Sequence, residues 1–164
     1  MADIIFNKQH FDELYNKYAS IIFKTAYNYL LNKEDAEDIL QEVFFKYFTH
    51  NKHFKDGNHE KAWLLRVTAN LCKNALRSKS RHNLQLNETI KIGDYSFENE
   101  SDSHIDLLKT MYELTENQRV AIYLFYYEQI PIKEIAKIMN SNENTVKSHL
   151  LRAKDNMKKY LEKE

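Results

Sequence analysis

Apolar side chains recur along this chain every three or four residues, which is the period of an amphipathic helix. We find no strand-like alternation of useful length. Asn32 precedes the second helical segment, where its side chain is expected to cap the helix, with Glu34 and Asp35 in the first turn. The pattern predicts an all-α fold. Its helices are expected over about 9–31, 33–48, 60–80 and from 105 to the end, with breaks at 114–115 and 129–131.

The segment from Pro131 to Ala153 has the spacing of a helix-turn-helix. Two short amphipathic helices are expected there, and the small side chain of Ala136 lies where they must cross. Four residues later, Asn140 tolerates the left-handed backbone of a tight turn, and Val146 is placed to fill the gap between the helices. Because the second helix of such a motif enters the DNA major groove, this segment indicates DNA binding.

A polar and acidic stretch separates the two groups of predicted helices. Residues 81–104 carry only scattered apolar side chains, so we expect a flexible acidic linker there. The chain then consists of two small helical domains, residues 1–80 and 105–164, and the second contains the helix-turn-helix.

The composition favours long helices, since 164 residues include only two glycines and one proline. No apolar run approaches the length of a membrane span, and the first residues lack a signal-peptide pattern. We therefore expect a cytoplasmic protein without membrane insertion. The single cysteine, Cys72, lies on an apolar helix face, where we expect it to be buried and structural.

The net charge is zero, with 24 basic and 24 acidic residues, but the charges are sorted into blocks. Residues 60–81 carry six lysines or arginines against one acid, and residues 145–164 carry six against three. Acids predominate at residues 34–42 and 83–118. Such sorting suits a protein that meets more than one kind of partner.

Enzyme chemistry finds little support in the sequence. Glycines 57 and 93 are too few and too far apart for a phosphate-binding loop. His50, His53 and His59 have no matching pattern of cysteines or carboxylates for zinc. No catalytic residue, metal ion or cofactor is therefore expected.

The third predicted helix has a narrow basic front and an apolar back, which consists of Leu64, Val67, Leu71 and Ala75 and is extended by Leu65, Cys72 and Leu76. The cations and one amide of that front fall within about 60° of one another, at about 100° per residue. A solvated surface would look the same, but the preceding loop adds an aromatic and an amide group, which unstacked bases require. The candidate residues are Arg66, Asn70, Lys73 and Arg77 on the helix, and Phe54, Lys55, Gly57 and Asn58 in the loop.

The second helix of the helix-turn-helix presents polar residues on the side away from Val146 and Leu150. Lysine and arginine suit guanine edges, and leucine packs on a thymine methyl group. Asn142 is expected to cap this helix. The residues that share the outer face are Asn144, Lys147, Ser148, Leu151 and Arg152.

The second predicted helix presents Glu34, Asp38, Gln41 and Glu42 outward. On the pattern alone, solubility explains this acidic surface. Docking to a basic protein partner is the alternative interpretation.

Three blocks of the sequence resemble the extracytoplasmic-function class of bacterial sigma factors, in the sigma-70 family. The first, residues 11–48, includes DAEDILQEVF; the second is AWLLRVTANLCKNALRS, residues 62–78; the third, residues 114–153, includes the helix-turn-helix. They follow one another in the family's order, with an acidic linker between the second and third.

The resemblance implies a role for each surface. The β′ coiled coil of core RNA polymerase would be contacted by Asp38, Gln41 and Glu42. Contacts between the chain and the β flap of the polymerase are also expected. The loop and basic helix would hold the melted −10 element, and the outer helix-turn-helix face would read the duplex −35 element. Asn144 and His149 would lie nearer the DNA backbone, and an anti-sigma factor is a further expected partner. The family usually has arginine at the position of His149 and glycine at that of Asn140.

Two alternatives remain open from the sequence. A helix-turn-helix regulator that binds duplex DNA without polymerase would explain the C-terminal helices but gives no role to Phe54, Asn70 or the acidic helix. A helical adaptor or antagonist would bind proteins only.

Overall fold

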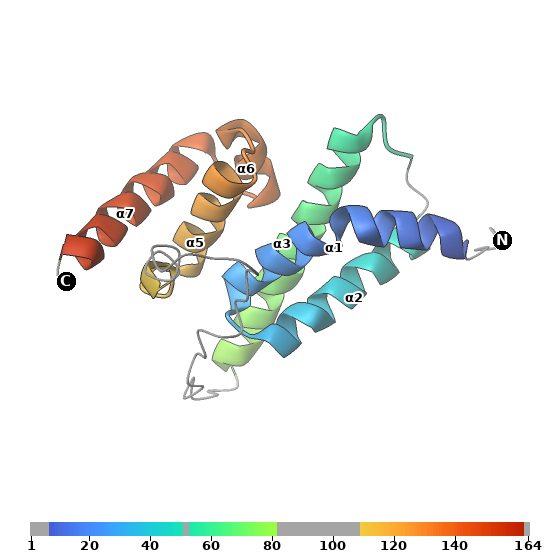
Figure 1. The fold of residues 1–164 in the computed structure, drawn as a ribbon, viewed down its shortest axis with the longest axis horizontal. Helices are drawn as coiled ribbons and strands as arrows, with labels where there is room; N and C mark the ends of the chain where they lie inside the picture. The colour runs from blue at the N-terminus through green and yellow to red at the C-terminus, as the bar shows by residue number, and fades with distance from the viewer. Residues whose placement is uncertain (1–6, 51–52, 82–108, 163–164) are drawn as a thin grey trace. The chain divides into compact units, whose positions relative to one another are not determined.

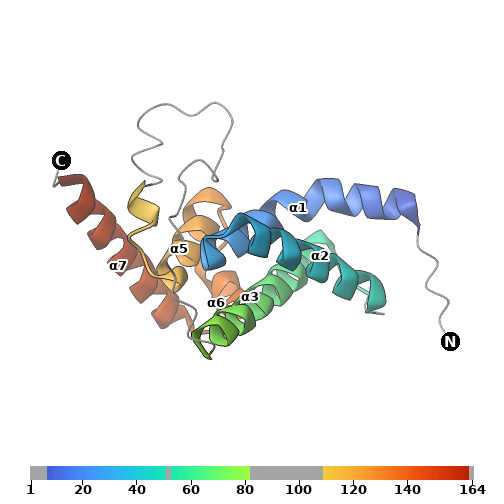
Figure 2. The ribbon, with the colours of Figure 1, turned by 90° about the horizontal axis from the view of Figure 1, so that it is seen from below.

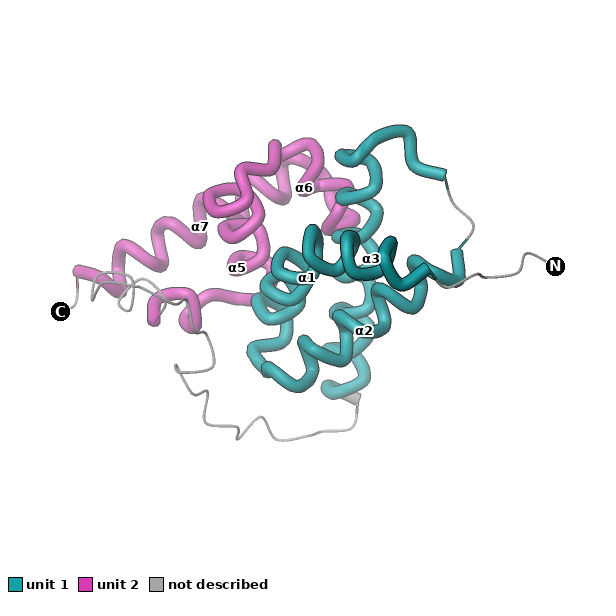
Figure 3. Tube along the Cα trace, turned by 45° about the vertical axis from the view of Figure 1, so that its right-hand side comes forward, with its two compact units in different colours: residues 1–83 teal, residues 84–164 magenta. Residues whose placement is uncertain are grey.

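Figure 1 presents the computed structural model, which describes residues 7–50, 53–81 and 109–162. Within these ranges the chain forms α-helices and one π-helical turn, and no strand, so the all-α prediction is confirmed. The chain divides into two compact units, Met1–Asn83 and Leu84–Glu164 (Figure 3). Residues 82–104 of the predicted linker lie outside the described residues.

Unit 1 consists of α1 (Lys8–Leu30), α2 (Lys33–Thr49) and α3 (Gly57–Arg81). Each of the three helices contacts the other two, and Figure 2 shows them lying side by side. The side chain of Asn7 caps α1 by accepting hydrogen bonds from two amides of the first turn. A bundle of this kind buries one stripe of each helix and leaves the opposite stripes for partners.

The connection between α1 and α2 is two residues long. Leu31 adopts a left-handed conformation with a φ of 50°, and its amide donates to the Tyr27 carbonyl (2.7 Å). Asn32 then caps α2, since its Oδ1 accepts from the Asp35 amide at 2.9 Å, as the sequence predicted. The Asp35 carboxylate also pairs with Lys79 of α3. These local bonds turn the chain sharply and fix the start of the acidic helix.

The buried arc of α3 is shifted toward one side of the predicted apolar face. Leu64, Leu65 and Cys72 are buried, as predicted, but Val67 and Leu71 are only half-buried. The reason is that α3 contacts both α1 and α2, so its buried arc is centred between the two neighbours. Cys72 is free and buried, as predicted, and burial raises the pKa of its thiol.

Unit 2 contains α5 (Glu116–Ile122), the π-helical turn η2 (Tyr123–Tyr127), α6 (Ile132–Ile138) and α7 (Glu143–Glu162). α7 packs against both α5 and α6 (Figure 1). Thr115 caps α5 through a reciprocal capping box with Gln118, at the first predicted break. The order of the helices places α6 and α7 together as the helix-turn-helix.

The π-helical turn was not predicted. It is marked by the hydrogen bond from the Glu128 amide to the Tyr123 carbonyl (3.1 Å), five residues apart. The helix ends at the second predicted break, where Gln129 has a φ of 56°. A repeat of apolar positions does not distinguish a π-helical turn from an α-helical one, so the pattern of residues does not predict it.

The turn between α6 and α7 confirms the predicted helix-turn-helix. Asn140 has a φ of 52°, and its amide donates to the Lys137 carbonyl (3.3 Å). The Ser141 amide donates to the Ala136 carbonyl (2.8 Å), which completes a Schellman motif. Ala136 and Val146 are both buried where the two helices meet.

Replacing Asn140 with alanine is expected to destabilise unit 2 by about 1 kcal/mol, because alanine pays the full steric cost of the left-handed region. Asn140→Gly is the matched control and should retain stability, since glycine enters this region freely. Thermal unfolding followed by circular dichroism measures both. Equal midpoints for the Ala variant and the unchanged protein would show that the turn does not depend on the residue at this position.

Candidate nucleic-acid and protein interfaces

The predicted docking residues lie together on the outer side of α2. Asp38, Gln41 and Glu42 are all exposed, while Ile39 and Val43 on the opposite side are buried. The spacing of three and four residues places Asp38, Gln41 and Glu42 on adjacent turns of one helix face. We call these three residues and Phe45 the acidic face.

Phe45 is the member of the acidic face that the sequence pattern missed. Its side chain is 68% exposed, although it follows the buried Phe44. It lies three residues after Glu42 and seven after Asp38, so the apolar ring continues the line of acids along the helix. A large apolar group surrounded by polar ones is typical of a protein contact. The exposure itself depends on which side of α2 packs against the neighbouring helices, and an apolar side chain at this position gives no sign in the sequence that it stays exposed.

The loop before α3 is shorter than predicted, because the helix begins at Gly57 and not near Glu60. The side chain of Asp56 accepts a hydrogen bond from the His59 amide (2.8 Å), and its carbonyl accepts from the Glu60 amide (3.1 Å). These bonds extend the helix by one turn. The exposed candidates Gly57 and Asn58 therefore belong to the first turn of α3, while Lys55 remains in the loop.

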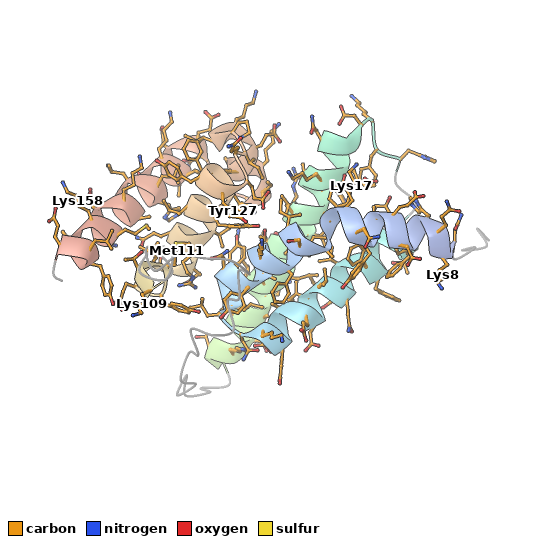
Figure 4. All side chains as sticks on the ribbon, viewed as in Figure 1. Lys8, Lys17, Lys109, Met111, Tyr127 and Lys158 are labelled. Carbon is orange, nitrogen blue, oxygen red and sulfur yellow. The ribbon has the colours of Figure 1, made fainter. Side chains whose placement is uncertain are left out.

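Lys17 adds a cation beside this loop that the sequence could not place. It lies on α1, with its ammonium group 5.1 Å from the ring centroid of Tyr18 (Figure 4). A β-carbon on Gly57 would lie 3.7 Å from this ammonium group. The hydroxyl of Tyr18 also donates to the Gly57 carbonyl (3.4 Å). Lys17 is thus available to a phosphate that approaches the start of α3.

Phe54 is half-buried within an aromatic cluster, and does not stand free in the loop. Its ring stacks on Tyr47 with an interplanar angle of 11° and a centroid distance of 5.9 Å. Trp63 is tilted against it at 5.6 Å, and His59 meets it edge to face at 5.4 Å. We call Tyr47, Phe54, His59 and Trp63 the aromatic cluster. Its rings hold Phe54 in one orientation at the surface.

A half-buried hydrogen bond between Tyr47 and Glu60 supports the aromatic cluster. The Tyr47 hydroxyl donates to Oε2 of Glu60 at 2.8 Å. Burial, together with this carboxylate, raises the pKa of Tyr47, so the hydroxyl keeps its proton and remains a donor at neutral pH. This hydrogen bond connects α2 to the first turn of α3 and holds the Tyr47 ring, on which Phe54 stacks.

The predicted basic stripe lies on one side of α3 and covers about 16 Å of helix. Arg66, Asn70 and Arg77 are exposed, whereas Lys73 is half-buried. Burial, and then the neighbouring charge of Arg77, lowers the pKa of Lys73. The stripe follows the aromatic cluster along the same helix, so a single strand could pass from one to the other.

The recognition helix α7 presents the outer face that the sequence predicted. The residues on this face are all exposed, and Leu151 is 62% exposed despite its apolar side chain. Val146, Leu150 and Ala153 are buried on the other side. The members of this face, which we call the recognition face, are Asn144, Lys147, Ser148, Leu151 and Arg152.

The start of α7 is capped as predicted. Oδ1 of Asn142 accepts from the Thr145 amide at 2.8 Å, and the amides of a helix's first turn are directed along the axis toward its N-terminal end. A shallow pocket of about 490 Å³ lies beside it, and its lining includes Lys133, Lys137 and Asn144. Lys137 pairs with Glu134 at 3.6 Å, and Glu143 also lines the pocket. The two ammonium groups and the N-terminal end of α7 favour a phosphate here.

His149 lies beside the recognition face and is half-buried. Burial, and then the positive charge of Arg152, lowers its pKa below the usual value of 6.5. The imidazole is therefore neutral at pH 7 and gains its charge only on acidification. At neutral pH it can offer a hydrogen bond to a DNA phosphate, but not the positive charge of an arginine.

The described residues show no grouping of three or more histidines, cysteines, aspartates or glutamates that could hold a metal ion. Among the same residues, no helix has both the length and the apolar character needed to cross a membrane.

Two family models match the chain, one on each unit. Sigma-70 region 2 matches residues 14–82, and Sigma-70 region 4 matches residues 104–157. The first match contains the acidic face, the aromatic cluster and the basic stripe. The second contains the recognition face.

Curated relatives extend the similarity over most of the chain. The ECF RNA polymerase sigma factor SigM of Bacillus subtilis is 32% identical over 154 residues, which cover 90% of this chain and 92% of the relative. The RNA polymerase sigma factor SigV of the same organism is 29% identical over 142 residues, with 87% and 85% covered. The solved sigma factor RpoE from Bartonella quintana, crystallised with the anti-sigma factor NepR, shares the fold with a TM-score of 0.78 at 21% identity, and the match covers 94% of this chain and 98% of RpoE.

Proposed function

Because this chain belongs to the sigma-70 family, in its extracytoplasmic-function class, it directs core RNA polymerase to specific promoters, and we propose which of its surfaces performs each part of that task. The observation that carries the proposal is the presence, in one chain, of an acidic helix face, a basic helix next to an aromatic cluster, and a helix-turn-helix. These surfaces suit a protein partner, a single strand and a DNA duplex, respectively.

The acidic face docks on the β′ coiled coil of core polymerase. Asp38 and Glu42 supply negative charge to basic helices, Gln41 supplies an amide, and Phe45 supplies an apolar anchor at one end of the acidic face. The need for this partner accounts for the acidic block in a protein that also binds DNA. Docking on the β flap falls to unit 2.

The aromatic cluster and the basic stripe hold the melted −10 element. Phe54 offers a ring on which an extruded base can stack, with Lys55, Gly57 and Asn58 around it. Arg66, Lys73 and Arg77 attract the phosphates of the same strand, and Asn70 offers hydrogen bonds to a base. Because a duplex cannot make these contacts, they favour strand opening.

The recognition face reads the −35 element in the major groove. Lys147 and Arg152 suit the acceptor edges of guanine, and Leu151 suits a thymine methyl group. Ser148 completes the polar contacts to the bases, while Asn144 and the neutral His149 lie nearer the phosphates. The pocket beside the start of α7 adds a phosphate contact through Lys133 and Lys137.

The chain performs no bond chemistry in this scheme; it supplies promoter choice to the polymerase and works where the polymerase works, in the cytoplasm. An anti-sigma factor stays a prediction for this chain, and the complex of the solved relative supports it. A regulator that acts without polymerase is the weaker proposal, because it leaves the region 2 unit without a task.

The −35 assignment is tested by selecting promoters from randomised DNA with reconstituted polymerase. Arg152→Ala is expected to lower the preference for one base by about tenfold at one position of the selected −35 element (the upstream block), because a good bidentate contact to guanine is lost. The base preferences within the −10 element (the downstream block) should be unchanged. Lys158→Ala, an exposed cation further along α7, is the matched control and should alter neither block. A change confined to the downstream block would contradict the assignment.

A further inference from the structure

The loop before α3 is held by two hydrogen bonds that run in opposite directions across three or four residues. The side chain of Asp56 accepts from the backbone amide of His59 (2.8 Å), and the side chain of His59 accepts from the backbone amide of Lys55 (3.3 Å). The Asp56 side chain thus satisfies the amide of His59, and the His59 side chain satisfies the amide of Lys55, the residue before Asp56. This reciprocal arrangement resembles a capping box, with histidine in place of the usual glutamate or glutamine.

The bond to Lys55 fixes the proton on the imidazole. A backbone amide can only donate, so Nδ1 of His59 must be the unprotonated acceptor, and the neutral ring carries its proton on Nε2. The ring plane is therefore set by the Lys55 backbone and not by chance rotation of an exposed side chain.

The same ring touches Phe54. The centroids of His59 and Phe54 lie 5.4 Å apart, with an interplanar angle of 75°. Phe54 makes two further ring contacts: it stacks on Tyr47 and is tilted against Trp63. His59 is thus the one member of the aromatic cluster that contacts the Phe54 ring and also binds the backbone of the adjacent loop residue.

We propose that His59 is a positioning residue for the loop before α3, which carries Phe54 and Lys55. His59 holds this loop in its binding conformation before DNA binds. This inference rests on the proposed role of Phe54. A loop that is already ordered loses less conformational freedom when it captures a base. The hydrogen bond between Lys55 and His59 therefore raises the affinity of the protein for the melted strand. His59 contacts Phe54 and Lys55 and acts through them.

The proposal is tested with polymerase reconstituted with His59 variants and a labelled single strand carrying the −10 element. His59→Asn keeps an acceptor at the position of Nδ1, and should bind within about threefold of the unchanged protein. His59→Phe keeps a ring against Phe54 but has no acceptor, and should bind about tenfold more weakly. His59→Gln moves the acceptor outward by one methylene group, and should resemble the Phe variant.

A scan with abasic sites distinguishes positioning from a general loss of structure. At the captured position, where there is no base to stack, the His59→Phe holoenzyme should bind as well as the unchanged holoenzyme. At all other positions its deficit should persist. A deficit that is the same at every position would overturn the proposal, and so would equal binding by the Asn, Gln and Phe variants.

Phe54→Ala separates this inference from the function on which it rests. Weaker strand binding by Phe54→Ala, with no effect of His59→Phe or His59→Gln, overturns only the role of His59. If Phe54→Ala also binds the strand normally, the base-capture assignment itself is wrong. Each variant is checked for its folded state by thermal unfolding before binding is measured.

Discussion

Gln41→Ala combined with Glu42→Arg is expected to weaken the binding of this chain to core RNA polymerase by more than about 100-fold, because like charges opposed across an interface cost several kcal/mol. The variant removes one amide contact and places a cation where the partner is basic. Both positions are exposed, so the substitution leaves the core of unit 1 unchanged.

The surroundings of these two residues make the prediction sharp. Asp38 lies one turn before Glu42 on the same face of α2, and Phe45 lies about one turn after it. Reversal at position 42 therefore falls in the middle of the acidic face, between a second acid and the exposed ring. Contacts near the centre of an interface are excluded from water and carry most of its free energy.

The measurement is the affinity of the purified chain for core polymerase, by fluorescence anisotropy at two salt concentrations. Asp12→Arg makes a matched control, because Asp12 is an exposed acid on α1, outside the acidic face. It should change the affinity by less than about threefold, since an exposed charge away from the contact acts only at long range. Unchanged core binding by the double variant would show that α2 is not the docking helix.

The features that the sequence predicted well are those determined by neighbours within a few residues. Asn32 and Asn142 cap the helices that follow them, and Asn140 takes the left-handed turn position. Asn32 and Asn142 each accept from an amide three residues later, and the short side chain of Asn140 tolerates the left-handed backbone, so the reason is visible in the local sequence.

The features that the sequence missed depend on partners far along the chain. The buried arc of α3 is set jointly by α1 and α2, which is why Val67 and Leu71 are only half-buried. Phe45 is exposed because α2 packs against α1 and α3 through its other side. Lys17 of α1 lies beside the start of α3, since a β-carbon on Gly57 would lie 3.7 Å from its ammonium group.

Phe54 illustrates both cases. Its place beside an amide and a glycine was enough to nominate it for base binding, but its neighbours in the aromatic cluster were not visible in the sequence. Tyr47 comes from α2 and Trp63 from the second turn of α3, and together they hold the ring at a fixed angle. The structure therefore adds to the hypothesis that the ring of Phe54 is held in place by other aromatic rings.

Phe54→Ala is expected to reduce promoter opening by about 10- to 100-fold, because base–aromatic stacking contributes roughly 1–3 kcal/mol per base. Binding of the duplex −35 element should be unchanged, since the recognition face lies in the other unit. Opening is measured by the fluorescence of 2-aminopurine placed in the −10 element, and duplex binding by anisotropy of a −35 fragment that ends before the −10 element.

Two controls separate stacking from packing, because Phe54 also contributes to the aromatic cluster. Phe54→Leu keeps apolar bulk against Tyr47 and Trp63 but offers no aromatic face, so it should open promoters nearly as poorly as Phe54→Ala while unfolding at a higher temperature. Phe54→Tyr keeps the face and should open them normally. If the Leu variant opens promoters normally, Phe54 supports the loop only by its volume. If opening and −35 binding fall together, the ring is not the platform for the extruded base.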